Sequence, residues 1–306
     1  MHFSIKHDSS TIYELTRKQV KTQYRDSSLG FIWTVLNPLL TMLVMWFVFD
    51  KIFGGDDPYY PIYLLTGNIM FTAIRNSSVQ CLESLVIHRD LLLRTKVELY
   101  VFPFSNCVST LVNFAFSLIA LLPFLVVKSI TIGAMPPAPL ADNMRVLFET
   151  VPILFSYQLP FLLLMLPAFF LFELGIGFFL SIIYVFFRDI KHIYSIFLVL
   201  WMYMTPIFYK VDLIANRSPT AFTILKLNPM YHFVKYFREC IYGGVTGFDF
   251  NAGAFQIKDL ANGSQVLNTY LPTWGTLGWC YVCGVAAFII GFSTFQIFKR
   301  KAIVRL

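Results

Sequence analysis

The chain has 306 residues, of which 57% are hydrophobic and only 13% are charged. Soluble domains carry about 25% charged residues, so this composition excludes an ordinary soluble protein and predicts a chain that crosses a membrane several times. The net charge of +7 would suggest nucleic acid only if the basic residues gathered on one soluble face. They fall between apolar runs instead, where membrane topology and lipid headgroups explain them.

The first predicted element is a basic amphipathic helix within residues 1–30, which we expect to lie at the cytoplasmic membrane surface. Its cations are Arg17, Lys18, Lys21 and Arg25. An uncharged run follows at 27–49, and a helix needs about 20 residues to cross the hydrocarbon core. The sequence therefore predicts an interfacial helix that leads directly into a first span at about 31–52.

Five further apolar runs predict five further spans. They are expected at about 61–82, 102–127, 161–187, 193–209 and 274–298. The intervening segments are a charged helix at 83–101, a proline-rich loop at 128–150, a tight turn at 187–192 and an outer segment at 210–273. With both termini cytoplasmic, the short inner segments hold most of the 24 Lys and Arg residues, as the positive-inside rule requires. The predicted fold class is an all-α polytopic membrane protein with six transmembrane helices, forming one transmembrane domain over 1–306.

The sequence contains none of the common nucleotide or zinc motifs. It has no Gly-x-x-x-x-Gly-Lys-Ser/Thr loop, no Gly-x-Gly-x-x-Gly after a strand and no His-Glu-x-x-His. Cys280 and Cys283 have the spacing of a redox motif, but their apolar surroundings favour simple helix packing. We therefore expect no catalytic residue, metal or cofactor in this chain, and any ATP must be hydrolysed by another chain.

Two charges fall inside predicted spans. Arg75 lies in the second span and Glu173 near the middle of the fourth. Each costs about 2.5–3.5 kcal/mol at the bilayer centre, so both should face protein or water. One interpretation is a structural ion pair, or an Arg75 side chain that extends to the inner interface. The other is a polar lining of a translocation path.

Aromatic side chains near the span ends fit an interfacial belt. Those deeper in a span could line a channel, and their faces would stack on sugar rings. The candidates for a channel lining or entrance are Arg25, Trp33, Asn37, Trp46, Trp201, Tyr203 and Phe208. In the fourth span Gly175, Gly177 and Ser181 form a small-residue face that predicts close helix packing.

Four stretches carry a family likeness through their order along the chain. They are Tyr24-Arg25-x-x-x-Leu29-Gly30-x-x-Trp33 with Asn37-Pro38-Leu39; the charged segment 85–101; Phe187-Arg188-Asp189-Ile190 with Tyr203-x-Thr205-Pro206; and Leu227-Asn228-Pro229-x-Tyr231 with Tyr236-x-Arg238-Glu239. Together they are spread over residues 24–239. The set resembles the membrane subunits, or permeases, of ABC exporters for cell-surface polysaccharides such as O-antigen, capsule and teichoic acid.

The resemblance implies a permease of the bacterial cytoplasmic (inner) membrane that forms a homodimer and recruits two copies of a separate ABC ATPase. ATP and magnesium would bind to that partner, and a lipid-linked glycan would be the substrate. The segment 83–101 would be a coupling helix, the first and fifth spans would line the channel, and short re-entrant helices would cap the exit before the last span. The residues expected at the ATPase are Leu85, Arg89, Asp90, Arg94, Lys96, Arg188 and Asp189.

Two other functions remain open from the residues. An ABC exporter of drugs or small lipids shares the six-span plan. A membrane-embedded glycosyl- or acyltransferase would need clustered His, Asp or Glu at a membrane face, and the sequence has no such cluster. The segments 128–150 and 247–272 look longer than the polysaccharide-exporter core requires, and the N-terminal cations could bind a pyrophosphate or only the inner leaflet.

Overall fold

The computed structural model describes residues 5–22, 32–48, 60–94, 97–133, 159–209, 211, 214, 217–242 and 274–305. Within these residues every regular element is a helix, which confirms the all-α class. The helices are α1 (Ile5–Thr22), α2 (Ile32–Trp46), α3 (Tyr60–Ile87), α4 (Arg89–Arg94), α5 (Val101–Gly133), α7 (Leu159–Phe186), α8 (Ile190–Met204), α10 (Pro219–Leu227), α11 (Pro229–Tyr242) and α12 (Trp274–Arg305).

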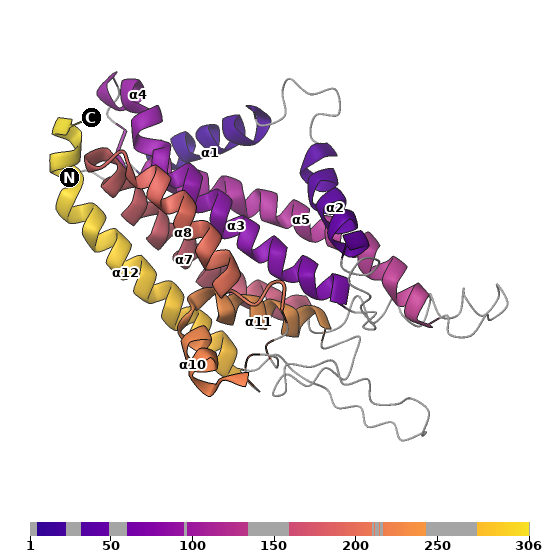
Figure 1. The fold of residues 1–306 in the computed structure, drawn as a ribbon. Helices are drawn as coiled ribbons and strands as arrows, with labels where there is room; N and C mark the ends of the chain where they lie inside the picture. The colour runs from indigo at the N-terminus through magenta and orange to yellow at the C-terminus, as the bar shows by residue number, and fades with distance from the viewer. Residues whose placement is uncertain are drawn as a thin grey trace.

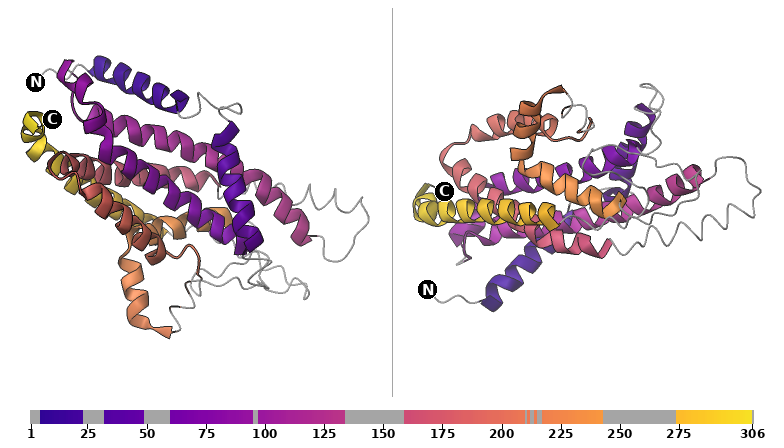
Figure 2. Two further views of the ribbon diagram at one scale, coloured as in Figure 1. Left: turned by 45° about the horizontal axis from the view of Figure 1, so that its top comes forward. Right: turned by 90° about the horizontal axis from the view of Figure 1, so that it is seen from below.

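The centre of the molecule is a bundle of α3, α5, α7 and α12 (Figure 1). Helix α11 packs against α3, α7 and α12, while α2 packs against α3 and α5. Helix α1 lies alongside α5 (Figure 2). The short helix α4 and the C-terminal end of α12 lie at one end of the bundle, and α10 lies at the other. We call these the α4 end and the α10 end.

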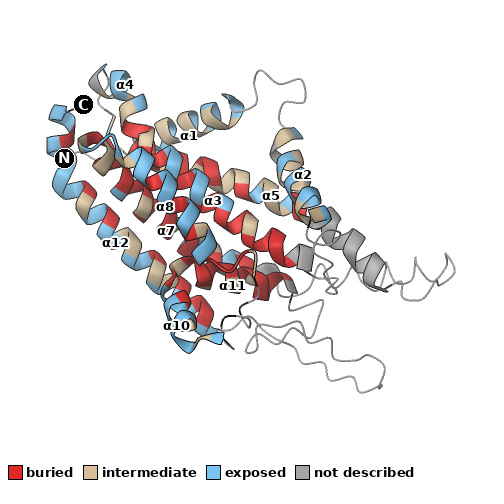
Figure 3. Ribbon diagram, viewed as in Figure 1, coloured by how far each residue is buried: buried red, intermediate tan, exposed pale blue. Residues whose placement is uncertain are grey.

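Several helices suit a membrane by length and hydropathy. Among the described residues the windows 101–122, 161–186 and 274–305 are each long and apolar enough to cross it. Helices α2 and α8 are apolar but have 15 residues each, which rise about 22 Å against a hydrocarbon core of about 30 Å. The outward sides of α8 and α12 are largely exposed, whereas α3, α7 and α11 carry most of the buried positions (Figure 3).

The observed helices extend beyond the predicted spans. Helix α5 continues to Gly133 and α12 to Arg305, whereas the predicted spans end at 127 and 298. In α12 the extension carries Lys299, Arg300, Lys301 and Arg305, and Lys and Arg are good helix formers that are favourable at a helix C-terminus. Hydropathy therefore identifies the part of a helix that can lie in the lipid, whereas the helix itself continues beyond that part.

The charged segment 83–101 is also not one continuous helix. Helix α3 runs through Ile87, His88 forms a turn and the short α4 follows, while residues 97–100 are not helical. The Ser84 carbonyl accepts from the His88 backbone N at 3.3 Å and lies 2.8 Å from the His88 ring Nδ1. The His88 side chain thus lies against a carbonyl in the last turn of α3, as cationic and imidazole side chains often do near a helix C-terminus.

Small residues let α7 and α12 approach closely. A Cβ added at Gly291 would overlap the carbonyl of Gly175, and one added at Gly284 would overlap that of Ala168. On the other side of α7, a Cβ at Gly177 would lie 2.9 Å from Sγ of Cys81 on α3. The predicted close packing at Gly175 and Gly177 is therefore confirmed, but the two glycines face different neighbours and do not form a single face.

Candidate functional site

The charged residues of α4 lie at the surface. Arg89, Asp90 and Arg94 are exposed, while Lys96 lies outside the described residues. Leu85 differs from the other expected ATPase contacts, because its side chain is 0% exposed and belongs to a core cluster with Leu99. The surface of this segment is thus formed by charges, and Leu85 holds α3 to the bundle.

The turn between α7 and α8 lies at the same end. Its residues Arg188 and Asp189 are exposed, and backbone bonds such as Phe187 N to the Ile183 carbonyl, at 2.8 Å, make it tight. Lys191, just after the turn, forms an ion pair with Glu83 of α3, and this contact holds the pKa of Lys191 above its usual value. The turn is thereby tied to the part of α3 that leads into α4.

Helix α1 presents its basic side to an open recess of about 620 Å³. The described lining is Ser10, Thr11, Glu14, Leu15, Arg17, Lys18 and Lys21. Thr16 donates to the Ser105 carbonyl at 3.4 Å, and Gln19 donates to the side-chain oxygen of Asn106. Both partners belong to the first turns of α5, so α1 is fixed with its cations turned to the surface.

The expected channel residues fall into three groups. Arg25 and the side chain of Trp46 lie outside the described residues. On α2, Asn37 is exposed and Trp33 is half-buried. Beyond α2, Tyr203 is 61% exposed and its ring packs on Phe208 at a centroid distance of 6.0 Å.

Helix α8 buries only one narrow stripe. The stripe is Tyr194, Leu198 and Trp201, spaced four and three residues apart. Trp201 is 8% exposed and packs edge-on against Phe71 of α3 and Phe172 of α7. The exposed apolar residues of α8 are Ile193, Ile196, Phe197, Val199, Leu200, Tyr203 and Met204. Trp201 therefore holds α8 against α3 and α7, and the opposite side of α8 exposes apolar side chains.

The two intramembrane charges do not meet. Arg75 is exposed, whereas Glu173 is 0% exposed and neither of its carboxylate oxygens has a hydrogen-bond partner among the described residues. The Thr110 hydroxyl is a neighbour of Glu173. It donates instead to the carbonyls of Asn106 and Cys107 in its own helix. Arg75 and Glu173 therefore do not form the ion pair that was one interpretation of the sequence.

A polar junction at the α10 end joins α8 to α11. The Asn228 side-chain oxygen accepts from Trp201 Nε1 at 2.8 Å and from the Met230 backbone N at 3.0 Å. Its amide nitrogen donates to the Met204 carbonyl at 3.2 Å and to Thr205 Oγ1 at 3.0 Å. Asn228 thus caps the start of α11, with Pro229 in the first helical position, and binds the end of α8 at the same time.

A second contact joins α11 to α3. Arg238 is 4% exposed, donates to the Tyr63 carbonyl at 2.9 Å and has its guanidinium 3.4 Å from the Tyr63 ring centroid. The Tyr63 hydroxyl in turn donates to the Tyr209 carbonyl at 2.8 Å. Gly67 makes room, because a Cβ there would lie 2.7 Å from Arg238 Nη2. Three segments therefore meet at one buried arginine.

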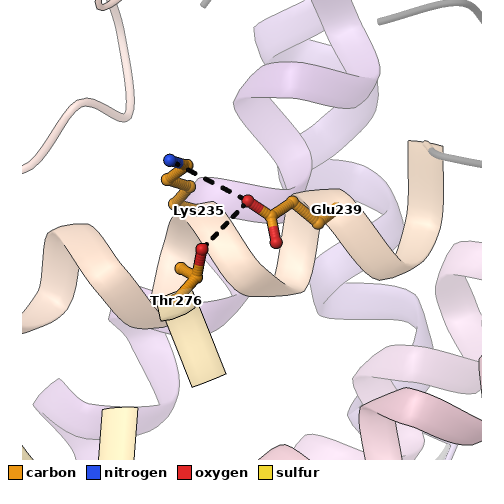
Figure 4. Close-up of polar contacts among 3 residues, drawn as sticks. All are labelled: Lys235, Glu239 and Thr276. Atoms are coloured by element: carbon orange, nitrogen blue, oxygen red, sulfur yellow. Dashed lines mark hydrogen bonds and ion pairs between the residues drawn. The ribbon is translucent and has the colours of Figure 1, made fainter. Parts of the chain in front are cut away.

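The next residue of α11 faces α12 (Figure 4). Glu239 is almost completely buried, accepts from Thr276 Oγ1 at 3.2 Å and lies 4.0 Å from Lys235 Nζ. Adjacent residues on a helix point to different sides, so Arg238 reaches α3 while Glu239 reaches α12. Helix α11 is held between them.

The structure brings together stretches that are far apart in the sequence. The third and fourth family stretches meet through Thr205 and Asn228, and the fourth also contacts α3 through Arg238. Sequence reasoning missed Lys191 and Glu83 as a pair and treated Asn228 and Arg238 only as parts of a pattern. Their residue types were a signal, since buried polar side chains need partners, but the partners lie in other helices.

Comparisons with known proteins identify the family of the chain. Residues 10–242 match the family described as ABC-2 type transporter. The chain is 30% identical over 231 residues to the O-antigen export system permease protein RfbA of Myxococcus xanthus, covering 76% of this chain and 80% of that protein. It is 26% identical over 254 residues to the protein of that name from Klebsiella pneumoniae, covering 82% and 88%. The chain is therefore an integral membrane protein that belongs to the ABC-2 type transporter family.

Proposed function

We propose that this protein is the membrane-spanning half of an ATP-driven ABC exporter that moves a lipid-linked cell-surface polysaccharide out across the bacterial cytoplasmic membrane. The observation that carries the proposal is the similarity, over three quarters or more of the chain, to permeases named for O-antigen export. The transporter is of the O-antigen, capsule or teichoic acid type. The chain is a transport subunit, and its partner hydrolyses the ATP.

The proposed topology has six spans with both termini in the cytoplasm. The α4 end carries the exposed charges of α4 and the basic residues Lys299, Arg300 and Lys301 of α12. The positive-inside rule assigns such an end to the cytoplasm. The α10 end then faces outward, with α10 and α11 as the re-entrant helices before the last span.

The proposed ATPase contact is formed by α4 and by the turn between α7 and α8, both at the α4 end. Arg89, Asp90 and Arg94 project from α4, and the exposed pair Arg188 and Asp189 lies in a turn tied to α3 through Lys191. Charged side chains of this kind form the polar rim of a protein interface. Two ATPase copies would bind the two chains of a homodimer.

The open side of α8 supports the homodimer. It consists of exposed apolar side chains between Ile193 and Met204, and α2 exposes Asn37. We place these sides at the centre of the dimer, where α2 and α8 of both chains would line the path of the glycan. The cations around the α1 recess would meet the pyrophosphate of the lipid carrier or the inner leaflet.

The experiment that tests the proposal is purification of the chain from its host with identification of any ATPase that co-purifies, followed by depletion of the chain. An exporter of this class co-purifies with an ATPase whose hydrolysis depends on the chain, and depletion traps lipid-linked polymer inside the cell. A complex that hydrolyses ATP while polymer still reaches the surface after depletion would favour the drug or small-lipid exporter. Transfer of a sugar or acyl group by the chain alone would identify a transferase.

A further inference from the structure

Helix α8 is fixed by polar contacts near both of its ends and by one apolar stripe between them. Lys191 at the α4 end pairs with Glu83 of α3. At the α10 end Trp201 and Thr205 are bound by Asn228. The rest of the helix surface is largely exposed, so few side chains interlock along its length.

The contact at the α4 end sits where an ATPase would act. Glu83 belongs to the last turns of α3, which lead into α4 with only His88 between the helices. The side chains of Lys191 and Glu83 are 53% and 24% exposed. A pair this exposed adds little to stability, so exchange of its charges should leave the fold intact while it changes the contact between α8 and the end of α3.

The contact at the α10 end uses the whole amide of Asn228. Its oxygen accepts two hydrogen bonds, and its nitrogen donates two, to the Met204 carbonyl and to Thr205 Oγ1. Helix α8 ends at Met204 and α11 begins at Pro229. The Asn228 side chain therefore binds the last residue of α8 and caps the first turn of α11. Movement of the end of α8 relative to α11 must break bonds of this amide.

We propose that α8 transmits movement of the α4 end to α11, and that Glu83, Lys191 and Asn228 are positioning residues for export. A hydrogen-bonded helix of this length is a rod of about 22 Å. Displacement of the end of α3 would pass through Lys191 into this rod and through Asn228 into α11. The inference rests on the proposed function, because a partner ATPase supplies the displacement.

A charge exchange tests the contact at the α4 end. In the assembled complex with its ATPase, Glu83→Lys and Lys191→Glu should each lower the polymer exported per ATP hydrolysed several-fold, with assembly retained. The double variant restores the opposite charges and should return the ratio to within about twofold of the original. Lys299→Glu, at the same end but on α12, is the matched control and should leave the ratio unchanged.

Variants of Asn228 test the contact at the α10 end. Asn228→Ser keeps a side-chain oxygen that caps α11 but is too short to bind Trp201 and Thr205. It should lower the export ratio several-fold in complexes that still assemble, and it should also lower the melting temperature by several degrees, because the buried Trp201 N–H loses its acceptor. Asn228→Asp keeps the length but places a carboxylate against the Met204 carbonyl, and it should lower the ratio further.

Two outcomes overturn the inference. Either a normal ratio in Lys191→Glu and Asn228→Ser, or a double charge variant as impaired as the singles, would show that α8 does not carry the movement. Failure of the proposed function looks different, since the unchanged complex would then hydrolyse ATP without exporting polymer.

Discussion

Arg238 shows what a single buried residue contributes at the α10 end. Its hydrogen bond to the Tyr63 carbonyl and its stacking on the Tyr63 ring lie away from water. We expect Arg238→Gln to lower the free energy of unfolding by about 2 kcal/mol, because a bond from a charged donor contributes about 1.5–3 kcal/mol. The melting temperature in detergent should fall by several degrees, whereas the exposed Arg300→Gln should leave it unchanged. Equal melting temperatures would contradict the role of Arg238.

His232 on α11 predicts a pH dependence. Its ring stacks on Trp279 of α12 at 5.5 Å, its Nε2 lies 2.8 Å from the Lys226 carbonyl, and burial followed by the charges of Lys235 and Lys226 lowers its pKa. The unfolded chain then binds the proton more readily than the folded one, so stability is complete above the usual pKa near 6.5 and falls as the pH drops below it.

The measurement is the melting temperature at pH 7.5 and at pH 5.5. The decrease on acidification should be smaller in His232→Gln, which has no proton to gain at this position. An identical decrease in both proteins would assign the pH dependence to other groups.

At the scale of elements, the packing of α7 on α12 depends on glycines. Gly291→Ala would force a Cβ into the Gly175 carbonyl, so the two helices must separate along their shared face. We expect a large loss of folded protein, measured as the monodisperse fraction after extraction.

The matched control for Gly291 is Gly278→Ala on the same helix. A Cβ at Gly278 would meet nothing within 4 Å, and alanine favours a helix over glycine by about 1 kcal/mol. This variant should be as stable as the original or more so. Similar behaviour of the two variants would show that the close approach of α7 and α12 is not required.

The elements themselves were largely predictable. Apolar runs identified α5, α7 and α12, and the basic amphipathic stretch identified α1, because hydropathy and periodicity depend on each segment alone. The residues at which the helices begin and end were less predictable. Helices α5 and α12 extend beyond their apolar runs, and the segment 83–101 turns at His88 between α3 and α4, which hydropathy does not register.

At the scale of the whole molecule, the two ends carry different chemistry. The α4 end is charged and exposed, and the α10 end is held by buried polar contacts. If the α4 end binds the ATPase, reversing both Arg89 and Arg94 to Glu should dissociate or uncouple it while membrane insertion stays intact. Co-purification and ATP hydrolysis of the complex measure this, with Arg300→Glu as control. Normal assembly and export in the double variant would remove α4 from the interface.

The sequence by itself determined the class of this protein: a membrane-embedded all-α chain, close helix packing at the small residues of α7 and membership of a transporter family. The first two follow from composition and from patterns within single segments, and the third follows from the order of four stretches along the chain. Only the tertiary structure decided which polar residues meet. It separated Arg75 from Glu173, paired Glu83 with Lys191 and brought Asn228 to Trp201. A buried polar group must find a partner, but the sequence does not say on which helix that partner lies.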